Sequence, residues 1–245
     1  MSNFTIKNLE QVDLPGIMQV QHEYARLHPG VQILPGELYL SPAFHQGMDV
    51  FCAYHPNGQM LGFAVAYAQV SNAPETKNHT VWAEIKVLPS MSQLGNLRDK
   101  LLEHLLARIN TIVSSHPDIP VNIYFQYFPY EKESIAFIQS KGFQYLRSVY
   151  SMQRDLRNNL PALTPPSGFA IGPWRLESQA EREQYIQARN HCFPDSPITL
   201  EEWVYFMSSP NWAHGTNFAT FHDDTLVGCL TAFWDEDQNQ IRDKK

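Results

Sequence analysis

The segment TVWAEIKVLPSMSQLGNLRDKLL, residues 80–102, contains three patterns in succession. An apolar run ends at Pro89, a short polar loop follows, and an amphipathic helix then begins. The helix carries its apolar side chains on one broad face: Leu97, Leu101, Leu102, Leu105, Leu106, Ile109 and Ile112. A strand that stops at a loop and leads into a helix leaves backbone N–H groups unpaired at the helix start, where phosphates bind readily. The segment therefore indicates a nucleotide-like ligand held mainly by main chain.

The residues after this segment extend the pattern. A second apolar strand is expected at 121–128, then a short helix and the dipeptide Gly142-Phe143. Together these motifs resemble the GNAT superfamily of acyl-CoA-dependent N-acyltransferases over roughly residues 4–156. Val87-Leu88-Pro89 matches the end of the family's fourth strand, and residues 134–143 match the family segment that ends in Gly-Phe, with Ile138 in place of a tyrosine. The resemblance implies an α/β (α+β) fold, with a mixed, mostly antiparallel sheet flanked by helices and closed by a strand pair at 145–156.

The resemblance also implies a binding site for acetyl-CoA as cosubstrate. The backbones of Ile85, Lys86 and Val87 would hydrogen-bond the pantetheine arm. The pyrophosphate would meet the loop and helix start formed by Gln93, Leu94, Gly95, Asn96, Leu97 and Arg98. With one residue inserted, Gln93 takes the family's Arg/Gln position, and Asn96 and Arg98 stand where the family has small residues. Bulky residues there crowd the approach of backbone to phosphate.

An N-acyltransferase needs a base for the amine, N–H donors for the oxyanion and an acid for the leaving thiolate. Glu84 is the candidate base, since the family often has a glutamate on this strand. By strand alternation Glu84 shares a face with Lys86, and the alternative role is pairing with Lys86 or with a neighbouring strand. Tyr130 is the candidate acid, with simple packing as its alternative. Arg98 either contacts phosphate or is a solvated helix charge.

The second half of the chain resembles the opening of the first half. Phe4–Leu9 and Phe169–Leu176 are both short strands, and the helix expected at 178–192 corresponds to the one at 14–27. Hairpins follow in both halves, and their second strands carry Gly62 and Gly228, so the offset is 165 to 166 residues throughout. We interpret this as an internal repeat, with a GNAT-like domain at 1–157, a proline-rich linker at 158–167 and a truncated second unit at 168–245. An unrelated C-terminal extension remains the alternative. An uncovered sheet edge in a truncated unit favours docking on the first domain or on another subunit, as in a homodimer.

Composition limits the other functions. The net charge of −7 argues against general nucleic-acid binding, and no apolar run is long enough to span a membrane. Three scattered cysteines and ten histidines show neither a disulfide framework nor metal-ligand spacing, which favours a reducing cytoplasm and predicts no metal. The sequence thus predicts transfer of an acetyl group from acetyl-CoA to a small-molecule or peptide amine. The alternative is a non-catalytic GNAT-like binding or regulatory protein.

Overall fold

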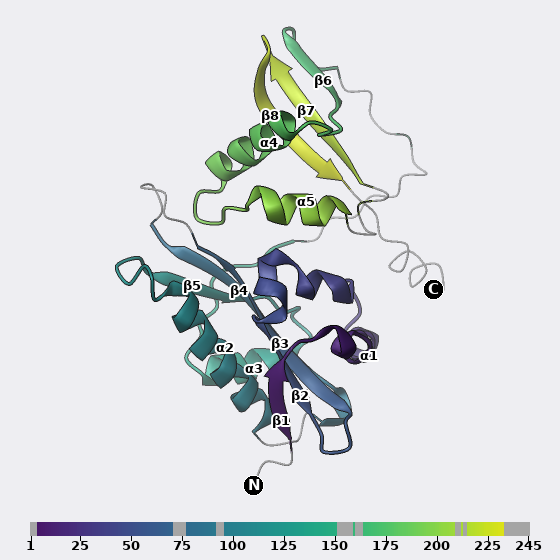
Figure 1. The fold of residues 1–245 in the computed structure, drawn as a ribbon, viewed down its shortest axis with the longest axis vertical. Coiled ribbons are helices and arrows are strands. Elements are labelled where there is room, and N and C mark those ends of the chain that lie inside the picture. The colour runs from purple at the N-terminus through teal and green to yellow at the C-terminus, as the bar shows by residue number, and fades with distance from the viewer. Residues whose placement is uncertain are drawn as a thin grey trace.

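In the computed structural model, which describes residues 4–70, 77–91, 96–150, 159, 164–208, 212 and 215–232, the chain forms two sheets with helices around each (Figure 1). The first unit contains strands β1 (Thr5–Asn8), β2 (Val50–Tyr54), β3 (Met60–Gln69), β4 (His79–Val87) and β5 (Val121–Phe125). Its helices are α1 (Leu14–Leu27), α2 (Leu97–Val113) and α3 (Lys132–Ser140), with short 3-10 helices η1 (Gln11–Asp13), η2 (Gly36–Leu40), η3 (Pro42–Gly47) and η4 (Pro89–Met91).

The first sheet has the strand order β1-β2-β3-β4-β5, and its last pair, β4 with β5, is the parallel one. Helix α2 covers one face, where Leu101 and Leu105 are fully buried against β2, β3 and β4. Helix α1 covers the opposite face, where Ile17 and Val20 pack with Phe63. The predicted helix is present, and its apolar stripe at residues 97–112 fills one side of the central sheet.

Glycine is required at one position of β3 beside the end of β4. A Cβ on Gly62 would lie 2.6 Å from the carbonyl oxygen of Lys86 and 2.9 Å from the Cα of Val87. The absence of a side chain therefore lets the two backbones approach closely where β4 leads toward the loop.

Two strand predictions need correction. The strand expected at 121–128 ends at Phe125, where its pairing with β4 stops. The closing strand pair expected at 145–156 is wrong for residues 145–150, which form no strand, and residues 151–156 lie outside the described part. Tyr145 and Tyr150 are instead 73% and 85% exposed. Aromatic and β-branched residues favour a strand only where a neighbouring strand is available to pair with them, and residues 145–150 are not paired with β5.

The second unit contains β6 (Phe169–Pro173), α4 (Gln179–Cys192), α5 (Leu200–Ser208), β7 (Thr216–His222) and β8 (Thr225–Ala232). Its sheet is antiparallel with the order β6-β7-β8. Ser178 caps α4 in the predicted capping box with Glu181. Asp223 and Asp224 both have positive φ, as a two-residue turn between β7 and β8 requires.

The two units share more than strand order. In β2 and β3 the pair Ala53↔Gly62 is followed by a register shift, and in β7 and β8 the pair Thr220↔Gly228 is followed by one as well.

The second unit lies against the first through α5 and the loop before it (Figure 1). There the hydroxyl of Tyr205 donates to the carbonyl of Glu37 at 2.9 Å, and the Gln69 amide donates to the carbonyl of Ser196 at 3.2 Å.

His79 is the first residue of β4, and its hydrogen bonding is unusual for a buried polar side chain. It is fully buried, and neither ring nitrogen has a hydrogen-bond partner among the described residues. The ring meets His116 edge-on at 5.5 Å. Burial lowers the pKa of His79 below its ordinary value, and His116 adds to this effect.

Acid is therefore expected to destabilise the protein through His79. Its contribution to stability is fully present above about pH 6.5, where the unfolded chain also keeps the ring neutral, and is lost as the pH falls through the lowered folded pKa. Thermal unfolding of wild type and His79→Phe at pH 7.5 and 5.0 measures this effect. The wild type should lose more stability on acidification than the variant, by at most about 1.4 kcal/mol per pH unit. The exposed His22→Gln serves as control, and equal pH slopes for wild type and His79→Phe would contradict the assignment.

Candidate active site

The candidate site begins where β4 and β5 separate. The two strands pair from His79↔Val121 to Ala83↔Phe125, and β4 then continues without β5 to Val87. The N–H of His79 donates to Pro120, before β5, whereas the N–H of Leu88 donates to Leu61 of the β3 side.

Backbone groups alternate sides along a strand, so the odd-numbered residues of β4 face β5. The N–H and C=O groups of Ile85 and Val87 consequently point to the side that β5 has left. Beyond Ala83, no described strand pairs with β4 on that side. Three residues are predicted to hold pantetheine. The backbone N–H and C=O groups of Ile85 and Val87 lie on the side without a strand, whereas those of Lys86 pair with β3.

A cavity of about 850 Å³ opens at this separation. Its walls come from β4, β5, the loop after α1, helix α3 and the segment that follows α3. It brings together the predicted Glu84, Ile85 and Lys86 with Ile138, the residue at the family's tyrosine position. The cavity is large enough for part of a cosubstrate and a small acceptor.

Glu84 and Lys86 form an ion pair in this cavity. The Lys86 Nζ lies 2.8 Å from Glu84 Oε1, and the lysine side chain is only 3% exposed whereas that of Glu84 is 35% exposed. The ion pair with Lys86, expected as the alternative role of Glu84, is present. The contact runs through Oε1, and the ion pair restricts the orientation of the carboxylate.

A buried network of oxygen atoms lies beside this pair. Glu131 is 4% exposed, and its carboxylate accepts hydrogen bonds from the Tyr24 hydroxyl at 2.5 Å and from the Phe128 N–H at 2.6 Å. Burial raises the pKa of Tyr24 well above its ordinary value, and the bond to Glu131 adds to the rise. Glu131 fixes the turn between β5 and α3.

Tyr127 is the tyrosine that the sequence did not single out. It lines the cavity, and its ring stacks on Phe125 at 6.2 Å. Burial raises the pKa of Tyr127 well above its ordinary value, and Tyr24, Glu84 and Glu131 raise it further by their charge. Its phenol therefore stays protonated at neutral pH. No signal in the run of aromatic residues at 124–130 distinguishes it from its neighbours.

Tyr130, the predicted acid, lies elsewhere. Its hydroxyl donates to the carbonyl of Pro29, and its ring stacks on Phe128 at 5.2 Å. It is 45% exposed and does not line the cavity. The structure places Tyr130 in a packing role that joins the end of α1 to the turn after β5.

The predicted phosphate site is described in part. Gln93, Leu94 and Gly95 lie outside the described residues. Asn96 precedes α2 and makes no side-chain cap to its first turn, and Leu97 is buried against the sheet. Arg98 lies 3.6 Å from Glu133 at the start of α3, so its guanidinium bridges the two helix starts.

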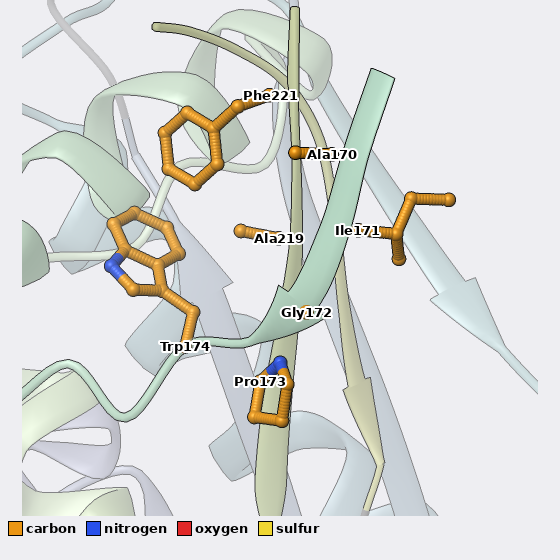
Figure 2. Close-up of a pocket in the computed structure, with 7 residues that line it drawn as sticks. All are labelled: Ala170, Ile171, Gly172, Pro173, Trp174, Ala219 and Phe221. Atoms are coloured by element: carbon orange, nitrogen blue, oxygen red, sulfur yellow. The ribbon is translucent and has the colours of Figure 1, made fainter. Parts of the chain in front are cut away.

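A smaller cavity of about 260 Å³ lies in the second sheet (Figure 2). Trp174, Ala219 and Phe221 project to one side of the sheet and Ile171 to the other. Its lining residues carry no titratable side chain, so it offers no acid or base.

Within the described ranges no cluster of three or more His, Cys, Asp or Glu side chains is placed to hold a metal. No helix in the same ranges is both long and apolar enough to span a bilayer.

No family model and no curated protein matches the sequence. Among solved structures, a GCN5-related N-acetyltransferase from Sphaerobacter thermophilus is similar over 96% of this chain and 73% of its own, at 15% identity and a TM-score of 0.62. Arabidopsis thaliana Naa50, in complex with the bisubstrate analogue CoA-Ac-MVNAL, is similar over 63% of this chain and 93% of its own, at 18% identity and a TM-score of 0.45. Glucosamine-6-phosphate N-acetyltransferase from Arabidopsis thaliana is similar over 62% and 99%, at 13% identity and a TM-score of 0.45.

The chain therefore has the fold of the GNAT N-acetyltransferases, with antiparallel-rich sheets flanked by helices. The predicted fold class is confirmed.

Proposed function

We propose that the protein transfers an acetyl group from acetyl-CoA to a small-molecule or peptide amine. The observation that carries the proposal is the separation of β4 from β5, which leaves the amides of Ile85 and Val87 unpaired by any described strand on that side, next to a cavity lined by Glu84 and Ile85. The pantetheine arm would lie along this free edge of β4 as a pseudo-strand. The start of α2 would receive the pyrophosphate.

In this reaction the amine nitrogen attacks the thioester carbonyl, forming a C–N bond while the C–S bond breaks. Glu84 takes the proton of the amine. The N–H groups on the free edge of β4 stabilise the oxyanion. The hydroxyl of Tyr127, in place of Tyr130, donates a hydrogen bond to the leaving thiolate, which takes up a proton from solvent and leaves as the thiol.

We further propose that residues 168–245 belong to a second GNAT-like unit. Strands β6, β7 and β8 and helix α4 correspond to β1, β2, β3 and α1, and the register shifts fall at matching glycines. The acetyl-CoA site proposed above lies in the first unit.

Acetyl-CoA binding provides the direct test. Calorimetric titration should show one saturable site, and amide hydrogen exchange should show protection at residues 84–88. Exchange at the turn between β7 and β8 is the internal control and should not change. Neither heat nor protection at millimolar acetyl-CoA would remove the proposal.

One observation favours the alternative of a non-catalytic binding protein, namely that Glu84 is already paired with the buried Lys86. Turnover on a panel of amines separates the two functions. Binding and protection without acetylation of any amine would support the alternative.

A further inference from the structure

Trp82 is exposed in the middle of an otherwise buried strand. Eight of the nine residues of β4 are buried or half-buried, whereas Trp82 is 38% exposed. It lies on the wall of the large cavity, so the exposed indole faces a space where a ligand fits. An aromatic surface of this size in a cavity wall is a binding surface for apolar groups.

A second aromatic ring extends this surface. Tyr124 is the register partner of Trp82 on β5, and the two rings lie 5.2 Å apart with an angle of 36° between their planes. Val31 and Leu34, from the loop after α1, line the same cavity. Trp82 and Tyr124 make an aromatic surface on the cavity wall at the level where β4 and β5 are still paired.

The candidate base lies beside this surface. Trp82 and Glu84 share one face of β4, about 6.5 Å apart along the strand. Cation–π attraction acts within about 6 Å of a ring centroid, a range comparable to the spacing of these two residues. Lys86 on the same face is buried and paired with Glu84, so it offers little to an anionic acceptor.

We propose that Trp82 and Tyr124 form the acceptor subsite and select cationic amines that carry an aromatic or flat apolar body. The inference rests on the proposed acetyl transfer and adds the substrate class to it. The ammonium binds against Glu84, and the apolar body of the acceptor stacks on the two rings. Small hydroxylated amines have the charge, and so the cation–π contact, but lack an apolar body that stacks on the two rings.

Two amines of equal charge, phenethylamine and ethanolamine, test the selection. With the wild type, kcat/KM for phenethylamine should exceed that for ethanolamine about 10-fold. Trp82→Leu should raise KM for phenethylamine about 3- to 10-fold and that for ethanolamine by a smaller factor, because ethanolamine loses only the attraction between its ammonium and the indole. Trp82→Phe keeps a ring and should retain most of the preference. Thermal unfolding of both variants monitors the fold.

A binding measurement separates this inference from the proposed reaction. Phenethylamine is titrated into the wild type and Trp82→Leu by NMR without acetyl-CoA. Weaker binding to Trp82→Leu supports the subsite even if no amine is acetylated, an outcome that removes only the proposed reaction. Equal binding by both proteins, or equal kcat/KM for the two amines, overturns the inference even if acetylation is observed.

Discussion

Replacing Glu84 with glutamine is expected to lower kcat for amine acetylation at least about 100-fold at neutral pH. A positioned general base contributes roughly 10²–10⁴-fold to such a reaction, and a glutamine amide cannot accept the proton of the amine. The substitution preserves size, and the side-chain oxygen of glutamine can still accept a hydrogen bond from Lys86, which lies 2.8 Å from Glu84 in the native protein. Binding of acetyl-CoA should therefore be unchanged. Steady-state kinetics with saturating acetyl-CoA measure the loss.

Glu103→Gln is the matched control for this experiment. Glu103 is an exposed glutamate on α2, paired with Lys100 at 2.5 Å and remote from the lining of the cavity. Its replacement should leave kcat within twofold of wild type. If Glu84→Gln retains more than a third of wild-type kcat, Glu84 serves only as the partner of Lys86 and another group must take the proton.

The parts of the fold visible in the sequence are those encoded by local patterns. The stripe of leucines predicts α2, and the Ser178 to Glu181 spacing predicts the start of α4. Turn residues predict both hairpins, since Asn57-Gly58 and Asp223-Asp224 tolerate positive φ. Each of these signals lies within a few residues of the element that it specifies.

The parts that the sequence could not predict depend on contacts between distant residues. Residues 145–150 have the composition of a strand, but a strand forms only where an edge is available in the right place. No sequence pattern distinguishes Tyr130 from Tyr127. Strand β5 is short and ends at Phe125, and with this end point Tyr127 lines the cavity whereas Tyr130 does not. The resemblance to the family located Glu84 and the free edge of β4. It could not give the partners of Glu131, since Tyr24 is 107 residues away.

A buried carboxylate outside the active site shows the same dependence on distant contacts. Asp49 is completely buried just before β2, and its two oxygens bind different partners. Oδ1 accepts from Arg108 Nε of α2 at 2.7 Å, and Oδ2 lies 2.6 Å from His45 Nδ1 of η3. No sequence pattern links Asp49 to an arginine 59 residues later.

Asp49 also supports a strained part of the backbone. His45, Gln46 and Gly47 have φ values of 46°, 52° and 91°, three successive residues in the left-handed region. Side chains other than glycine are disfavoured there by roughly 1–3 kcal/mol each. The bond from His45 to Asp49, together with the Asp49 N–H donating to Phe44 at 3.2 Å, holds this turn against β2.

Asp49→Ala is accordingly expected to reduce the free energy of unfolding by about 3 kcal/mol. Removing one partner of a buried ion pair leaves the other charge unpaired, at a cost of roughly 3–5 kcal/mol, and Arg108 is 19% exposed, so water offsets part of that cost. Denaturation in urea, monitored by far-UV circular dichroism, measures the change. Asp118→Ala, at an exposed aspartate, should change stability by less than about 0.5 kcal/mol.

A double-mutant cycle identifies the cause of the loss. If Asp49 acts through Arg108, the combined Asp49→Ala and Arg108→Met protein should be more stable than the sum of the single changes predicts, by about 1–3 kcal/mol, because no unpaired charge remains. Strictly additive effects would assign the loss to the turn at 45–47 instead. A loss below about 1 kcal/mol for Asp49→Ala would show that the buried carboxylate is not required to join η3, β2 and α2.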